Sequence, residues 1–173
     1  MLHLIHMVAR LWALCGTGDM DAGLALLERW WPRYRRAAVR RVASLRTIAE
    51  ATRLRLLISA SQRQGRSPAR GLVREARALA RLPAPMAAGY GMRALSRLAF
   101  LEGNRERALG HLRASSASFA AADARFEEAR NQVAEGQLVD RTGVPREVAL
   151  DRLREAGHER PDLAVASHFP ELL

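Results

Sequence analysis

The sequence predicts an all-α protein, a right-handed solenoid of about four antiparallel helical hairpins that forms one domain over residues 1–173. Hydrophobic residues make up 49% of the chain and aromatic residues only 5%, and the abundant alanine, leucine and arginine favour helices over strands. Apolar residues also recur at helical spacing. Glycine-centred breaks at Gly18, Gly65, Gly103 and Gly143, which are 47, 38 and 40 residues apart, divide these stretches into hairpins of irregular length.

The stretch from Met92 to Leu112 contains the clearest hairpin signal. An apolar helical stripe runs into Gly103-Asn104, and a second stripe begins at once. A small residue, Ala108, stands five positions after the glycine. A small side chain at this place lets two antiparallel helices approach closely, so we expect the paired helices of a helical-repeat protein.

Apolar stripes and break signals together locate the individual elements. We expect helices over residues 2–14, 20–31, 36–62, 68–82, 86–102, 105–122, 124–141 and 146–156, and a short turn over 161–168. In the first half, Asp19 caps the second helix, and Pro32 ends or kinks it. Gly65 suits the position just after the long third helix, and Ser67 and Pro68 suit the N-cap and first turn of the fourth.

The second half repeats these signals. Pro83 and Pro85 separate the fourth helix from the fifth, and the Thr-Gly-Val-Pro run at 142–145 separates the seventh from the eighth. We expect an irregular C-terminal tail over 157–173. No linker or low-complexity segment divides the chain, which favours a single domain. The first helix begins at the initiator methionine without a cap, so we expect a chain truncated at its N-terminal end.

The charge is strongly basic and unevenly distributed. All 28 basic side chains are arginine, and the formal net charge is +10. Residues 1–101 hold 18 arginines and 5 acidic residues, whereas residues 102–173 hold 10 and 13. A basic half joined to a mildly acidic half indicates an acidic protein surface, a nucleic acid or a neighbouring domain as partner, or else a solvated helical surface.

The single cysteine, Cys15, cannot form an internal disulfide and is typical of a reducing compartment. The N-terminus has no basic region before its apolar run and no small-residue cleavage site, so it does not resemble a signal peptide. No stretch reaches the roughly 18 apolar residues that span a bilayer. We therefore expect a cytoplasmic protein without membrane association.

Four groups of side chains are candidates for a chemical site: His3 with His6, His158 with Glu159 and His168, Glu127 with Glu128, and Cys15. The histidine groups lack the four closely spaced ligands of a structural zinc site. The two adjacent glutamates do not share a helix face, so we expect them to be solvated. A lone cysteine is typical of packing. We expect no catalytic residue, no metal and no cofactor.

Part of the sequence resembles the tetratricopeptide pattern. Leu95, Ser96, Gly103, Ala108 and Leu112 stand at its leucine, small, turn-glycine, alanine and apolar positions. Two large residues of the pattern are replaced, since Met92 stands where tryptophan is common and Ala99 where tyrosine is common. The resemblance implies a tetratricopeptide-like repeat array.

Longer runs, at 101–109, 112–114, 118–122 and 153–164, resemble the C-terminal helical-repeat region of large bacterial, myxobacterial-type serine/threonine protein kinases. The usual aromatic before Gly157 is absent, and Glu171 follows Pro170 where the family closes on Pro-Gly. The resemblance implies a kinase-associated signalling protein. It implies no catalysis, because the kinase motifs are missing and the chain has no lysine.

These observations predict a non-catalytic protein–protein interaction module that docks a peptide, an acidic surface or the kinase domain of a parent protein. The alternative is an arginine-rich helical protein that binds nucleic acid or another polyanion through arginines next to Trp30, Trp31 and Tyr34. The candidate partner-binding residues for the two readings are Arg33, Arg35, Arg36, Arg40, Arg41, Arg46, Arg53, Met92, Arg93 and Ala99.

Overall fold

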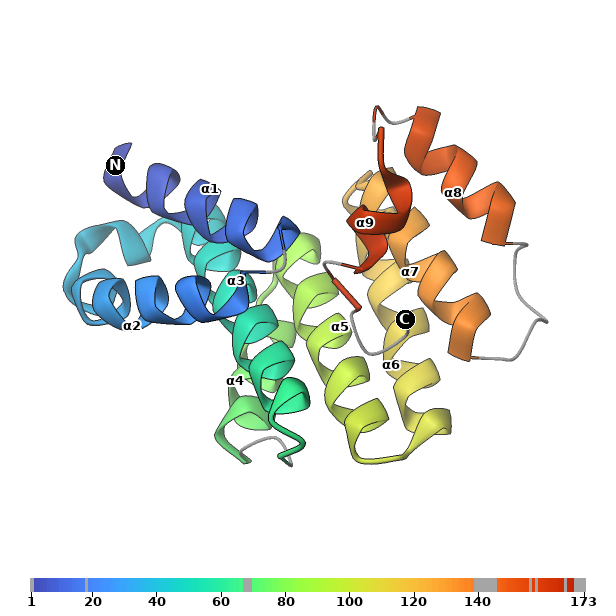
Figure 1. Cartoon of the computed structure of the whole chain (residues 1–173), viewed down its shortest axis with the longest axis horizontal. Helices are drawn as coiled ribbons and strands as arrows, with labels where there is room; N and C mark the ends of the chain where they lie inside the picture. The colour runs from blue at the N-terminus through green and yellow to red at the C-terminus, as the bar shows by residue number, and fades with distance from the viewer. Residues whose placement is uncertain are drawn as a thin grey trace.

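The computed structural model describes residues 2–17, 19–66, 70–138, 146–155, 157, 159–166 and 168–169, and within these ranges the chain forms helices and no strands (Figure 1). The elements are α1 (Leu2–Gly16), α2 (Met20–Arg36), the 3-10 turn η1 (Ala38–Arg41), α3 (Ala43–Arg63), α4 (Arg70–Ala80), α5 (Pro85–Leu101), α6 (Arg105–Ala121), α7 (Arg125–Leu138), α8 (Arg146–Glu155) and α9 (Pro161–Ala166). The predicted all-α class is confirmed for the described residues.

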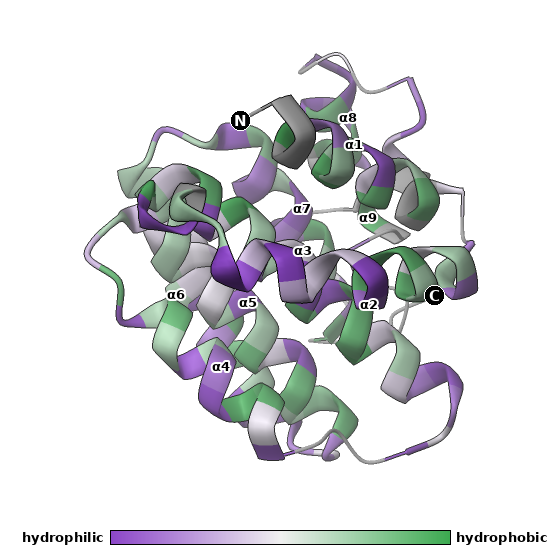
Figure 2. Ribbon diagram, turned by 90° about the vertical axis from the view of Figure 1, so that its left-hand side faces the viewer, coloured by the Kyte–Doolittle hydropathy of each residue, from purple (hydrophilic) through white to green (hydrophobic). Residues whose placement is uncertain are grey.

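Helix α5 lies at the centre of the molecule. It packs against α3, α4 and α6, and its contact with α6 is the most extensive between any two elements. The seven residues from Arg93 to Ala99 are all buried. Outward from this centre, α6 packs against α7 and α7 against α8, while α1 and α2 pack against each other and against α3. Figure 2 shows hydrophobic and hydrophilic residues alternating along the helices, as expected of amphipathic helices.

The hairpin of α5 and α6 has the turn that its sequence predicts. Gly103 has φ +78°, a left-handed conformation that favours glycine at the end of a helix. The Asn104 side chain accepts a hydrogen bond from the amide of Arg107 at 3.0 Å, and so caps α6. Ala108 is fully buried, and the Ser96 hydroxyl donates to its carbonyl at 2.7 Å. The close approach expected at Ala108 is present.

Glycine also determines how α5 meets α4. A Cβ on Gly91 would stand 2.3 Å from the backbone nitrogen of Ala80 and 2.8 Å from the carbonyl oxygen of Ala76. Both atoms belong to backbone, which cannot rotate away as a side chain does. The two helices therefore cross at a distance that only glycine allows at this position.

Two regions of the N-terminal half differ from the predicted boundaries. Helix α2 continues through Pro32 to Arg36, and α3 begins at Ala43 after the turn η1, whereas the sequence suggested a break at Pro32 and a long helix from residue 36. The physical reason is packing: the extra helical turn buries Tyr34, which is 2% exposed, against Val8 and Ala49. This burial outweighs the one backbone hydrogen bond that Pro32 removes.

The expected irregular tail over 157–173 contains α9, which begins at Pro161 as the short turn expected over 161–168 does, and which packs against α7 and α8. Val165 and Phe169, each 2% exposed, complete a hydrophobic cluster with Leu112, Val133 and Leu153. Burial of these apolar side chains fixes α9 and Phe169 against the neighbouring helices.

Some expected features fall on residues that the structure does not describe. These are Gly18, Ser67, Pro68, the run 142–145, His158, Pro170 and Glu171. Of the helices that the structure describes, none combines the length and apolar character needed to cross a membrane.

Candidate functional site

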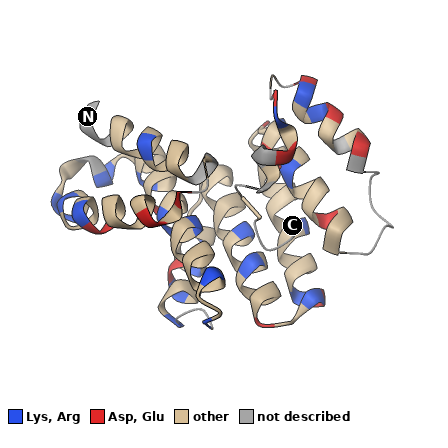
Figure 3. Ribbon diagram, in the orientation of Figure 1, with Lys and Arg blue, Asp and Glu red and all other residues tan. Residues whose placement is uncertain are grey.

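A groove lies where the end of α2, the turn η1 and the start of α3 face the connection between α4 and α5. Its volume is about 560 Å³. It is lined by Arg35, Arg36, Ala37, Ala38, Arg40, Arg41, Ala43, Arg46, Thr47, Leu82, Pro83 and Ala84. We refer to it as the arginine groove. Figure 3 shows basic residues gathered at the end of α2 and along the turn that follows.

The arginine groove carries positive charge without local compensation. Its described lining contains five arginines and no acidic residue. Arg46 donates to Glu50 at 2.9 Å, within α3. The other four arginines form no ion pair with a described residue and are exposed. Like charges held near one wall repel one another, so an anionic group that enters the groove relieves this repulsion.

Local structure explains part of this clustering. Arg35 and Arg36 stand in the last turn of α2, where the carbonyl ends of the helix favour cations. Arg40 and Arg41 end the short 3-10 turn η1 and stand just before the N-terminal end of α3, which favours anions over cations. The charge on η1 therefore has no role in helix stability that would account for it.

The neighbouring aromatic residues face the interior instead of the groove. The ring centroids of Trp30 and Trp31 lie 5.1 Å and 4.8 Å from that of Tyr34, and none of the three lines the groove. The guanidinium of Arg53 lies 4.7 Å from the Trp31 ring. Burial, with a further contribution from Glu50, raises the pKa of Tyr34 to about 12. The expected pairing of exposed arginines with exposed aromatics is thus not present among the described residues.

The structure divides the predicted binding residues into groups. Arg35, Arg36, Arg40, Arg41 and Arg46 come together in the arginine groove. Arg33 is exposed but does not line it, Arg53 forms an ion pair with Glu75, and Met92 is half-buried against the central hydrophobic cluster.

Arg93 and Ala99 were expected to face a partner, but they are only 4% and 2% exposed. Both lie on the stretch of α5 that its neighbours enclose. A partner cannot reach either side chain in this structure.

A buried polar cluster around Glu127, which is 1% exposed, was not expected from the sequence. The Glu127 carboxylate accepts hydrogen bonds from Arg93, from Arg130 at 2.9 Å and from the Tyr90 hydroxyl at 3.0 Å. The expectation that Glu127 is solvated is therefore wrong, because α7 turns this residue toward α5. The spacing of Glu127 and Arg130, three apart on one helix, was the available signal.

The buried cluster shifts the ionisation of its members. Burial alone would raise the pKa of Glu127, but Arg93 and Arg130 hold it below its usual value. Burial raises the pKa of Tyr90, with a further contribution from Glu127. Both groups have fixed charge states at neutral pH, so the cluster ties helices together and has no group poised to exchange a proton.

Metal-binding geometry is not found in the part of the chain that the structure describes: no group of three or more histidine, cysteine, aspartate or glutamate side chains could hold an ion. His6 is exposed, and the side chains of His3 and Cys15 lie outside the described ones. Comparison of the chain with protein-family models, with curated proteins and with solved structures gives no match.

Proposed function

We propose that this protein is a non-catalytic interaction module that binds an acidic segment of another protein in the arginine groove. The observation that carries the proposal is the clustering of Arg35, Arg36, Arg40 and Arg41 around one concave surface without a described carboxylate among them. Arginine binds carboxylates through paired hydrogen bonds, so aspartate and glutamate side chains match this surface.

The shape of the arginine groove favours an extended peptide over single-stranded nucleic acid. Between the arginines its lining is apolar and small, with Ala37, Ala38, Pro83 and Ala84. Single-stranded nucleic acid is held largely by bases that stack on aromatic side chains, and no aromatic side chain lines this groove. Double-stranded nucleic acid, which needs only phosphate contacts, is the second candidate.

The wider assignment is also a proposal. We infer a tetratricopeptide-like, right-handed solenoid of about four hairpins from a kinase-associated signalling protein that acts in the cytoplasm. The turn at Gly103 and the capped start of α6 at Asn104 support the hairpin unit. The kinase association rests on the sequence resemblance alone.

Binding of a fluorescent peptide rich in aspartate and glutamate, measured by anisotropy, tests the proposal. The variant Arg36→Gln/Arg40→Gln/Arg41→Gln removes three groove charges. We expect it to weaken binding by about tenfold or more, because it removes charge-assisted hydrogen bonds. The control variant Arg113→Gln/Arg125→Gln/Arg154→Gln loses the same charge from side chains that are 61%, 89% and 53% exposed and lie outside the groove. It should bind as the unmodified protein does.

Equal weakening in the two triple variants would show attraction by net charge only and would overturn the proposal, as would the absence of peptide binding. Tighter binding of a duplex oligonucleotide than of the peptide, with a steep dependence on salt, would support the polyanion alternative. Circular dichroism of both variants checks that the helices remain folded.

A further inference from the structure

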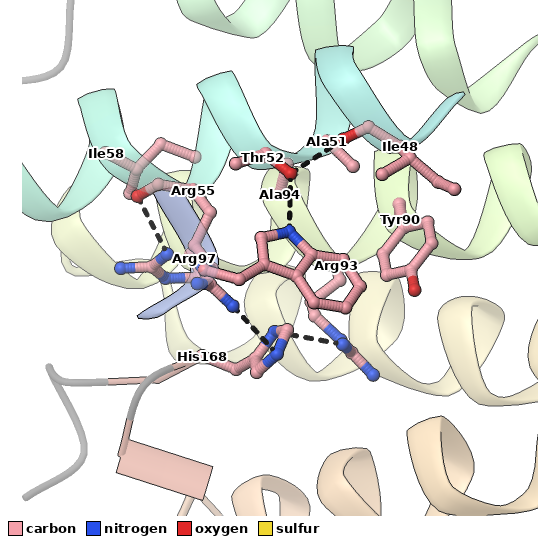
Figure 4. Close-up of a pocket in the computed structure, with 11 residues that line it drawn as sticks. Ile48, Ala51, Thr52, Arg55, Ile58, Tyr90, Arg93, Ala94, Arg97 and His168 are labelled. Atoms are coloured by element: carbon pink, nitrogen blue, oxygen red, sulfur yellow. Dashed lines mark hydrogen bonds between the residues drawn. The ribbon is translucent and has the colours of Figure 1, made fainter. Parts of the chain in front are cut away.

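A second, smaller cavity lies between α1, α3, α5 and His168, and it shares no lining residue with the arginine groove. Its volume is about 40 Å³, enough for two or three water molecules. Trp12 is among its lining residues, and Figure 4 shows the guanidinium groups of Arg55 and Arg93 directed toward His168. The described lining contains three arginines, one histidine and no carboxylate.

Arg55 is incompletely satisfied at this cavity. Its Nη1 lies 3.0 Å from Nε2 of His168, while its Nε is buried and has no hydrogen-bond partner among the described residues. An arginine can only donate hydrogen bonds. A buried donor without an acceptor is unfavourable, so an acceptor placed beside it would be stabilised.

His168 adds a second unsatisfied donor. Its Nε2 faces Arg55 at 3.0 Å and its Nδ1 faces Nη1 of Arg93 at 3.4 Å. A neutral imidazole accepts at one nitrogen and donates at the other. Each ring nitrogen faces an arginine, so in either neutral tautomer one ring N–H points at an arginine N–H. Two donors thus face each other without an acceptor between them.

The two neighbouring arginines are donors as well, and both have partners of their own. Arg93 already donates to Glu127, and the Nη groups of Arg97 donate to the Ser59 hydroxyl at 2.9 Å and to the Arg55 carbonyl at 3.4 Å. Burial of the His168 ring holds its pKa well below the usual value, and the positive charges of nearby arginines lower it further; these are Arg55, Arg130, Arg93 and Arg97. The ring is therefore neutral. Relief of the donor conflict therefore has to come from an added acceptor.

We propose that this cavity binds a small oxyanion, a phosphate or carboxylate group, held by Arg55 and by the N–H of His168. The size suits a compact group. The positive charge favours an anion, and the unsatisfied donors favour oxygen acceptors. The apolar part of the lining, Trp12, Ile48 and Ile58, would lie against the remainder of a larger ligand that carries the group. The bound anion would join α3 and α5 to the segment that follows α9.

Isothermal titration calorimetry of the whole chain with sodium phosphate and, separately, sodium acetate tests the proposal at constant ionic strength. We expect saturable binding of one or both anions with a single site. The variant Arg55→Gln should weaken binding by about tenfold or more. The control Arg113→Gln, in which an exposed arginine is changed, should bind unchanged. Preference between the two anions separates a phosphate site from a carboxylate site.

The variant Ala51→Leu offers an independent test, because it adds bulk to the lining and leaves the donors in place. It should also abolish binding, and it serves if Arg55→Gln does not fold. Binding that survives in both variants, or that is absent for both anions, would overturn the proposal. Loss of anion binding in the variant Arg36→Gln/Arg40→Gln/Arg41→Gln alone would place the site in the arginine groove and would equally overturn it.

Discussion

Arg93 on α5 and Glu127 on α7 form an ion pair inside the fold, although 34 residues separate them. The Arg93 guanidinium also donates from Nε to the Asn131 side chain at 2.7 Å and from Nη2 to the Glu127 carbonyl at 2.8 Å. Its Cζ lies 4.6 Å from the centre of the Phe119 ring on α6. One arginine thus connects three helices, and its charge is balanced by a carboxylate that is 1% exposed.

The variant Glu127→Gln should destabilise the protein strongly. It leaves the buried charges of Arg93 and Arg130 without their carboxylate, and removal of one partner of a buried pair lowers the free energy of unfolding by about 3–5 kcal/mol. Urea denaturation followed by circular dichroism measures the effect. In the control Glu135→Gln the exposed pair with Arg113 is lost, and the change should stay below about 1 kcal/mol. Similar losses in both variants would contradict the assigned role of Glu127.

Stability should fall as the pH decreases below about 6.5, because of His168. Its pKa in the folded protein is well below the unfolded value, so the unfolded chain binds a proton there first and is favoured. Between pH 7.5 and 5.5 the free energy of unfolding should decrease by about 1 kcal/mol from this group. In the variant His168→Leu the loss of unfolding free energy over this interval should be smaller by that amount. An unaltered pH profile in His168→Leu would refute this role.

The variant Gly91→Ala should separate α4 from α5. Its methyl group would overlap the backbone of Ala80, and overpacking of this kind costs about 1–3 kcal/mol. The matched control is Gly110→Ala on α6, where a Cβ meets nothing within 4 Å. There the same change should stabilise the protein by about 0.5–1 kcal/mol, since alanine favours a helix. Thermal or urea denaturation should show a lower free energy of unfolding for Gly91→Ala and a higher one for Gly110→Ala. A change in the same direction in both variants would argue against the close helix crossing.

Loss of the cap at Asn104 should weaken the start of α6. The variant Asn104→Ala removes the acceptor for the Arg107 amide and should lower the free energy of unfolding by about 1 kcal/mol. The variant Asn104→Asp retains a side-chain acceptor and should be close to the unmodified protein. Hydrogen exchange at the Arg107 amide provides a local measurement. Equal protection of this amide in both variants would show that the cap is not needed.

The sequence alone determined the helical class and the hairpin at Gly103 and Asn104, because helical spacing, glycine turns and caps act between residues close in the chain. Its candidate binding residues include all five groove arginines, of which Arg35, Arg36, Arg40 and Arg41 are near neighbours in sequence. These features depend on residues within one short segment of the chain and need no contact with a distant segment.

Tertiary structure decided the rest. Whether Pro32 ends α2 depended on the burial of Tyr34, and the aromatic residues beside the arginines turned inward to pack on one another. The pairing of Arg93 with Glu127, and the donors that Arg55 and His168 direct into one cavity, join segments far apart in the chain. Such contacts depend on which helix packs against which. The same pattern of arginine and glutamate along a helix is also compatible with a solvated surface. Only the packed fold therefore shows whether these side chains are buried and paired or exposed to solvent.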